Sequence, residues 1–431
     1  MARSTSRHLM INTHQNQFTL LLKAEMLKAL GCTEPIAVAL CGAKAREVLG
    51  EMPKSVIVQC SNNIVKNVKG VIVPTTGDMR GIDTACMLGI IAGDSSLGLE
   101  VLQKVKETDI VKLKELLKTD ICKVEKLKSD DNLHIICIVK GEKDEVEVEI
   151  LHSHTNIVSV KKNGKKLVEL DKKINNKNNV SADFLTFNNI YDFVNNFNIK
   201  DLQDLLDMEI ECNNTIAEEG LKNKYGANVG KTILKNANGN VKEIVKAHAS
   251  AGSDARMSGC NLPVVINSGS GNQGITILCG IYQYWKYLEL PKEKLYRALC
   301  LANLLALWIK RQIGKLSAFC GAVSAGATVG AGITYLRDGT KKQIEDTIIN
   351  ALNSAGGIIC DGAKSSCALK IALSVDCGII SSDMALNGNV FKNGEGLVKG
   401  NIEDTVDAVC KMAKNGMRET DEEILRLMLR K

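Results

Sequence analysis

The chain changes its residue pattern near its middle, and this change is the strongest restriction on its fold. Before about residue 160, β-branched residues alternate or cluster in short runs such as SVIVQCS and EVEVEIL, which is typical of strands. Residues 161–180 (KKNGKKLVELDKKINNKNNV) are polar and rich in lysine and asparagine. From about residue 182 the pattern is mostly helical and is interrupted by glycine clusters. The pattern therefore predicts two parts of different fold class, with a boundary in 161–180.

We expect an α+β protein with two domains. Residues 1–180 are expected to form a mixed α/β domain with an antiparallel sheet, built from segments such as NLHIICIVKG and EVEVEILHSHTNIVSVKKNG. Residues 181–431 are expected to form a largely all-α domain. A chain of 431 residues with 45% hydrophobic content is long enough to bury two cores.

Some local elements of the first domain are also predicted. Residues 15–50 are expected to form helices interrupted at GCTEP, where Gly31 suits a helix end and Thr33 a helix cap. The segment VKGVIVP, residues 68–74, clusters β-branched residues and is predicted to be a strand. Residues 79–118 are expected to be mainly helical.

Composition excludes two classes of partner. A net charge of +6 spread over the chain, with only 4% aromatic residues, lacks the basic face and stacking rings of a nucleic-acid-binding protein. No apolar run reaches the roughly 18–20 residues that cross a bilayer, so we expect a soluble protein. Fifteen cysteines, an odd number without a signal peptide, indicate reduced thiols in the cytoplasm. We hypothesise that MARSTSRHLM is a leader ahead of a start at Met10.

Three cysteines stand out as metal ligands. Cys320 begins a segment of small side chains (CGAVSAGATVGAGITY) that is predicted to be a tightly packed helix, and Cys360 and Cys367 flank a glycine-containing turn in CDGAKSSCALK. Thiolates near such turns can hold an iron–sulfur cluster, because backbone amides stabilise its charge. Zinc is less well matched, since it usually shows close C-x-x-C pairs and a fourth ligand. Spacing alone leaves a buried, inert Cys320 as an alternative.

The segment NSGSGNQGIT, residues 267–276, is the best predicted anion site. Its glycines allow backbone amides to converge, and the apolar run after it is predicted to be a helix whose N-terminus faces a substrate carboxylate. The substrate-binding candidates here are Ser270, Gly271, Asn272 and Gln273. A phosphate loop would need a Lys-Ser/Thr ending and a preceding strand, and no clear strand is predicted. An ordinary glycine-rich turn is the alternative.

Other polar side chains are candidates for holding the substrate. Asn63 and Lys66 are predicted at a strand turn and His154 at the end of a strand, where ordinary turn chemistry is the alternative. Arg256 in SDARM could bind a carboxylate through two hydrogen bonds or form a structural salt bridge with Asp254.

Cys32 is a candidate for a reactive thiol that transfers protons. It is predicted at the N-terminus of a helix, where the helix dipole favours a thiolate. The alternative is an inert buried thiol. Glu34 could carry the proton instead, or serve only as an acid in the first helical turn.

Eight motifs in order resemble those of one enzyme family from about residue 20 to the C-terminus: GCTEPIAVAL, VPTTGDMRG, SHTNIV, SDARM, NSGSGNQGIT, KLSAFCGA, CDGAKSSCALK and NGEGLV. They are similar to the L-cysteine desulfidase branch of the iron–sulfur L-serine dehydratase family. This resemblance implies a [4Fe-4S] enzyme that converts L-cysteine into pyruvate, ammonia and sulfide without pyridoxal phosphate. It also implies that Cys320, Cys360 and Cys367 hold the cluster and that Cys32 is catalytic.

One departure from the wider family concerns the C-terminus. The resemblance implies a further cluster ligand from a C-terminal cysteine in the serine dehydratases, whereas this chain has no cysteine after Cys410. The departure favours the desulfidase branch and an iron open to substrate. We expect the site to lie between the two domains, closed by one chain or by a homodimer. The alternatives are an L-serine dehydratase, a non-catalytic protein that stores or senses iron or sulfide, and a pyridoxal-phosphate lyase.

Overall fold

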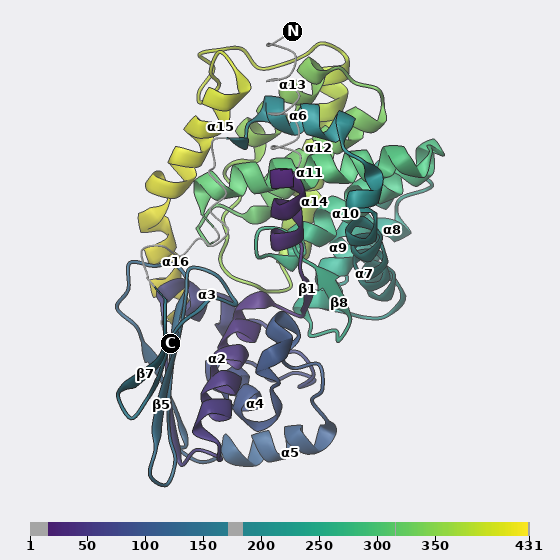
Figure 1. The fold of residues 1–431 in the computed structure, drawn as a ribbon. Coiled ribbons are helices and arrows are strands. Elements are labelled where there is room, and N and C mark those ends of the chain that lie inside the picture. The colour runs from purple at the N-terminus through teal and green to yellow at the C-terminus, as the bar shows by residue number, and fades with distance from the viewer. Residues whose placement is uncertain (1–15, 171–183, 315, 430–431) are drawn as a thin grey trace.

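The computed structural model describes residues 16–170, 184–314 and 316–429 (Figure 1). It confirms the predicted α+β class, with a mixed α/β part followed by a largely helical part. The hypothesis of a leader ahead of Met10 and the later half of the predicted boundary segment lie outside the described residues. None of the described helices has the length and apolar character needed to span a membrane.

The first part is built on a six-stranded sheet with the order β3-β2-β4-β5-β6-β7. Neighbouring strands are antiparallel except β2 and β3, which are parallel. The sequence analysis missed β3, and β7 forms a hairpin with β6 inside the polar segment where the boundary was expected. The strands are β2 (Ser55–Cys60), β3 (Cys122–Lys126), β4 (His134–Lys140), β5 (Glu145–Leu151), β6 (Ile157–Lys162) and β7 (Lys165–Glu169).

Helices pack against this sheet, and α2 lies on β4 and β5 with α4 beside it. A Cβ atom on Gly89 would lie 2.0 Å from the carbonyl oxygen of Ala39, so only glycine allows α4 to approach α2 this closely. The helical segments of this part are α2 (Thr33–Leu49), α3 (Asn62–Lys69), α4 (Ile82–Ala92), the 3₁₀ turn η1 (Ser95–Glu100) and α5 (Glu107–Leu116).

Three local predictions for this part are wrong. Residues 68–74 do not form a strand, because α3 continues to Lys69 and only Ile72 makes an isolated bridge. Thr33 is not the cap of α2, because Cys32 occupies the N-cap position. Gly31 follows a strand rather than a helix, and its positive φ of 68° and its contact with Pro74 both require glycine.

The second part consists of packed helices. Their bounds are α6 (Phe187–Asn196), α7 (Gln203–Lys222), α8 (Val229–Lys235), α9 (Val241–Met257), α10 (Gly271–Leu288), α11 (Lys292–Ile313), α12 (Gly321–Leu336), α13 (Lys341–Ala355), α14 (Cys367–Leu386), α15 (Ile402–Lys411) and α16 (Arg418–Leu429), with short turns η3 (Ile199–Asp201) and η4 (Met412–Gly416).

Helices α12 and α14 run side by side in the same direction. A Cβ atom on Gly326 would lie 2.3 Å from the carbonyl oxygen of Ser374, and one on Gly330 would lie 2.4 Å from that of Gly378. These two contacts have the same sequence offset, so the helices are parallel and their N-termini lie at the same end. The small residues predicted in α12 therefore allow the backbones to touch, as expected.

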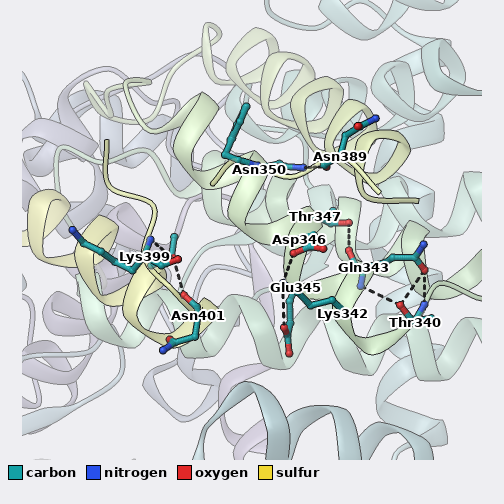
Figure 2. Close-up of polar contacts among 12 residues, drawn as sticks. Thr340, Lys342, Gln343, Glu345, Asp346, Thr347, Asn350, Asn389, Lys399 and Asn401 are labelled. Carbon is teal, nitrogen blue, oxygen red and sulfur yellow. Dashed lines mark hydrogen bonds and ion pairs between the residues drawn. The ribbon is translucent and has the colours of Figure 1, made fainter. Parts of the chain in front are cut away.

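Further along the chain, polar contacts fasten the segment after α14 onto α13 (Figure 2). The side-chain amide of Asn350 donates to the carbonyl of Asn389 (3.0 Å) and accepts from the amide of Phe391 (3.0 Å). At the start of α13, Thr340 and Gln343 form a reciprocal capping box. These bonds satisfy the backbone of a long irregular segment, so the helices around it keep a fixed arrangement.

Each end of the chain packs against the part of the molecule that is distant from it in sequence. The helix at residues 16–25 lies among the helices of the second part, where the ring of Phe18 contacts those of Phe184 (4.8 Å) and Phe193 (4.9 Å) (Figure 1). Just after it, β1 (Lys28–Leu30) pairs with β8 (Pro263–Val265) of the second part. At the other end of the chain, α16 packs on α3. Contacts near both ends of the chain therefore connect the first part to the second.

Candidate active site

Two segments far apart in the sequence pair through their backbones and bring Cys320 next to Cys360. The amide of Cys360 donates to the carbonyl of Ala318 (2.6 Å), and the amide of Cys320 donates to that of Ile358 (3.1 Å). The two bonds form an isolated antiparallel bridge. This bridge fixes the separation of the two thiols.

Cys367 reaches the same place from the neighbouring helix. It is the first residue of α14, and Cys320 is the N-cap of the parallel helix α12. Both sulfurs therefore lie at the N-terminal ends of packed helices, where the helix dipoles favour negative charge. Cys320, Cys360 and Cys367 line one cavity of about 100 Å³.

The surroundings shift the pKa values of the three thiols in different directions. The hydrogen bond between the thiols raises the pKa of Cys320 and lowers that of Cys360 to about 6. Burial raises the pKa of Cys367. A backbone amide directed at each sulfur favours its thiolate form: Ala322 at Cys320, Gly362 at Cys360 and Lys364 at Cys367.

The three thiols fit an iron–sulfur cluster. Within the described ranges, no three His, Cys, Asp or Glu side chains converge closely enough to bind a single metal ion. A cluster makes a different demand, because each cysteine binds its own iron and the sulfurs surround the group. Three sulfurs that line a cavity, each with a backbone amide directed at it, meet that demand.

Cys32 lies on the same cavity, although it comes from the first part of the chain. Its side chain packs with Val71 and Met257, and Cys367 packs against this group. One chain therefore brings Cys32 to the three other cysteines without a second subunit. The structure differs from the sequence analysis in the charge of this thiol: burial, and then the charge of Glu34, raise the pKa of Cys32 far above its usual range. These effects outweigh the helix dipole that was expected to favour a thiolate.

Glu34 is the ionised partner of this thiol. Burial acts to raise its pKa, but the interactions with His154 and Arg256 outweigh burial and lower the pKa to about 2. The carboxylate accepts hydrogen bonds from the Sγ of Cys32 (3.4 Å) and the Oγ1 of Thr33 (3.2 Å). The Nε2 of His154 lies 3.9 Å from the other carboxylate oxygen. At rest, the proton is on sulfur and the negative charge is on Glu34.

The predicted anion loop forms the opposite wall. As predicted, it leads into a helix, α10, and the Oγ of Ser270 caps that helix by accepting from the amide of Gln273 (3.4 Å). The expectation that no strand precedes the loop is wrong, because β8 does. A Cβ atom on Gly271 would lie 2.4 Å from the Nε of Arg256, so only glycine fits there.

Arg256 is fastened by two of its three nitrogens. Its Nε donates to the carbonyl of Gly31 (3.1 Å) and its Nη1 to the side-chain oxygen of Asn272 (3.1 Å). Its Nη2 and the Oε1 of Gln273 are buried, and both lack a hydrogen-bond partner among the described residues. Both side chains line the cavity. A buried donor and a buried acceptor without partners destabilise the folded protein, and a polar ligand that binds both would remove this cost.

A buried chain of side chains supports the anion loop from behind. The amide of Asn303 donates to both carboxylate oxygens of Glu209 (3.1 Å each), and Asn267 donates to Asn303 (2.9 Å). Asn267 in turn accepts from the hydroxyl of Ser268 (2.8 Å), which belongs to the loop. Glu209 has no exposed surface, and burial raises its pKa to about 8.

Replacing Glu209 by glutamine is expected to change how stability depends on pH. The pKa of Glu209 is about 8 in the folded protein, higher than its ordinary value of 4.5. Its contribution to stability is therefore present below pH 4.5 and is lost as pH rises towards 8. A shift of this size corresponds to roughly 5 kcal/mol. Glutamine resembles the protonated acid, so the free energy of unfolding of Glu209→Gln, measured in urea, should decline less between pH 5 and 8 than that of the wild type. Parallel pH profiles would contradict this.

The remaining predicted residues lie outside the cavity wall. Asn63 and Lys66 are on α3 rather than at a strand turn, because Ile64 and Val68 recur at helical spacing and are buried. Lys66 donates to the carbonyl of Cys360 (3.3 Å) and pairs with Asp421 of α16. The side-chain amide of Asn63 donates to Asn132 (3.2 Å). His154 follows β5 and stands behind Glu34.

Three polar residues of the cavity wall were missed as site residues: Thr33, Lys310 and Ser317. Thr33 lies between the predicted positions Cys32 and Glu34 in GCTEP and could have been included. Asn67 was expected near the site together with Asn63 and Lys66, and it does line the cavity. The signal for Lys310 is a single charge that ends an apolar helical run (ALCLANLLALWIK). Ser317 lies in a loop and gives no comparable signal.

Comparison with known proteins identifies the family of this chain. Residues 96–426 match the family model of the serine dehydratase alpha chain. A UPF0597 protein of Lachnoclostridium phytofermentans is 48% identical over 411 residues, covering 95% of this chain and 98% of that relative. The chain belongs to the UPF0597 family. A UPF0597 protein of Finegoldia magna is also 48% identical, over 416 residues that cover 96% of this chain and 99% of the relative.

Members of the UPF0597 family extend to lower identity, as in a protein of Treponema denticola that is 39% identical over 421 residues. The serine dehydratase alpha chain domain of this UPF0597 protein contains Cys320, Cys360 and Cys367, whereas Cys32 and Glu34 precede the matched residues. Iron–sulfur clusters are used in general by the serine dehydratase alpha chain family. The names of these UPF0597 relatives specify no substrate.

Proposed function

We propose that the protein is an L-cysteine desulfidase, a carbon–sulfur lyase that forms pyruvate, ammonia and hydrogen sulfide from L-cysteine and water without pyridoxal phosphate. The serine dehydratase alpha chain domain supports the broader statement that it is a lyase acting on an amino acid by β-elimination. The observation that carries the proposal is the pair of unpartnered polar atoms on Arg256 and Gln273, which face a cavity lined by four cysteines.

These atoms match the polar groups of an α-amino acid. The free Nη2 of Arg256 can donate to a carboxylate, and the N-terminus of α10 adds backbone amides beside it. The free Oε1 of Gln273 can accept from an ammonium group. The side chain of Gln273 also lies against Gly321, the residue after Cys320. An amino acid held in this way has its β substituent near the cysteine sulfurs.

Cys320, Cys360 and Cys367 would hold a [4Fe-4S] cluster. Three ligands leave one iron without a protein ligand, and when bound the cluster would supply a Lewis acid for the departing sulfur. Cys410, the last cysteine of the chain, is not among the residues that line the cavity, and its Sγ donates to the carbonyl of Ile309 (3.6 Å). This supports an iron that stays open to substrate.

Cys32 and Glu34 are proposed to move the proton at the α carbon. The carboxylate holds the thiol through a hydrogen bond, and its charge is one reason why the thiol keeps its proton in the empty site. A substrate ammonium group near Gln273 would offset that charge and lower the pKa of Cys32. Substrate binding would therefore prepare the sulfur to accept the proton.

The test is an anaerobic assay of the protein before and after reconstitution with iron and sulfide. Sulfide and pyruvate are measured from L-cysteine, and pyruvate from L-serine, in each state. Sulfide release that depends on bound iron, faster than pyruvate release from L-serine, is the expected result. Faster turnover of L-serine would identify a serine dehydratase instead. A bound cluster without product from either amino acid would mean a protein that stores or senses iron or sulfide.

A further inference from the structure

Lys310 is a buried lysine that has no role in the proposed reaction. It lies in the last turn of α11, and its side chain lines the cavity with Cys320 and Cys360. The residue is only 4% exposed. Among the described residues, no side chain or backbone group forms a hydrogen bond or an ion pair with its ammonium group.

The other buried lysine near the cysteines differs in this respect. Lys66 also has almost no exposed surface, but its charge is paired with Asp421 of α16. Within the described part of the chain, the charge of Lys310 has no such carboxylate. Burial lowers the pKa of Lys310, and negative charge on Cys360 and Cys320 raises it. The groups that can balance its charge are therefore the sulfurs of Cys360 and Cys320, once both are thiolates.

A buried cation without a partner is destabilising by itself, because desolvation is not repaid. It becomes favourable when an anionic group occupies the space beside it. Three thiolates on a four-iron cluster bring such a negative charge, and a substrate bound through sulfur adds to it. Lys310 also lies near the C-terminus of α11, where the helix dipole favours a positive charge.

We infer that Lys310 is a positioning residue that supplies the counter-charge for the cluster held by Cys320, Cys360 and Cys367. The inference rests on the proposed function, because it needs the cluster. It assigns Lys310 an electrostatic role: its ammonium group stabilises the loaded site and destabilises the empty one. A lysine that served only the packing of α11 would not have opposite effects on the two states.

The test compares Lys310→Met with Lys310→Arg, and uses Lys200→Met as an exposed control. Methionine keeps the length of the side chain and removes its charge. Without cluster, Lys310→Met is expected to melt at a higher temperature than the wild type, because an unpaired buried charge is gone. With cluster, it is expected to release iron to a chelator about tenfold faster. Lys310→Arg and Lys200→Met should release iron at the wild-type rate.

Two results would overturn the inference alone. One is a lower melting temperature of cluster-free Lys310→Met, which would indicate a structural role for Lys310. The other is an unchanged rate of iron release from loaded Lys310→Met. A wild-type protein that takes up no cluster would instead overturn the proposed function, and the inference with it. Iron release and melting temperature are measured without substrate. Both results therefore do not depend on which amino acid the enzyme uses.

Discussion

Cys360→Ala is expected to lose both the cluster and the activity. Cys360 is held by a backbone bridge beside Cys320, and removing its sulfur leaves only two cysteine ligands on the cavity wall. Two ligands cannot hold four irons against loss to solvent. After anaerobic reconstitution, the variant should contain little iron, lack the visible absorbance of the cluster and release no measurable sulfide from L-cysteine.

The matched control for this variant is Cys377→Ala. Cys377 lies on α14, the helix that begins with Cys367, but its Sγ points to the carbonyl of Ala351 (3.7 Å) and is not on the cavity wall. This variant should keep the iron content and turnover of the wild type. Normal iron content in Cys360→Ala, or equal losses in both variants, would contradict the assignment of the cluster ligands.

Cys32→Ala is expected to separate cluster binding from catalysis. Cys32 shares the cavity with the three proposed ligands but reaches it from α2, so its removal leaves the ligands in place. The variant should keep the absorbance of the cluster. Its kcat should fall by about 10²–10⁴, the usual contribution of a group that transfers a proton in the rate-limiting step.

Cys41→Ala serves as the control on the same helix. Its thiol is buried and donates to the carbonyl of Val148 (3.4 Å), away from the cavity. Turnover of folded Cys41→Ala should match the wild type. Retained activity in Cys32→Ala would show that Cys32 does not transfer the proton. Glu34, the other ionisable group of this pair, would then be the candidate.

The sequence was most informative where a local pattern decides the structure. Alternating β-branched residues located β2, β4 and β5, and the small residues of α12 indicated close helix packing. The glycine-rich loop before α10 was located for the same reason, since helix caps depend on a few adjacent residues. Short β3 was missed, because its exposed residues (CKVEK) lack an alternating pattern.

The geometry of the site depends on contacts that no local pattern contains. The position of Cys32 at the cavity follows from the β1–β8 pairing and from packing against Met257, residues more than 200 positions away. The protonated state of its thiol follows from burial, which overrides the helix dipole. Asn63 and Lys66 were placed at a turn because a short polar helix and a turn have similar composition.

The packing of each chain end against the distant part of the molecule restricts how substrate can enter. Enzymes with a site between two bodies often open it by a hinge motion, which needs a few flexible connections. Here the chain joins the two parts through β1 paired with β8 and, near its other end, through α16 packed on α3. A rigid-body opening would have to break these contacts. Access to the cavity is therefore expected to depend on small movements of the loops at its rim.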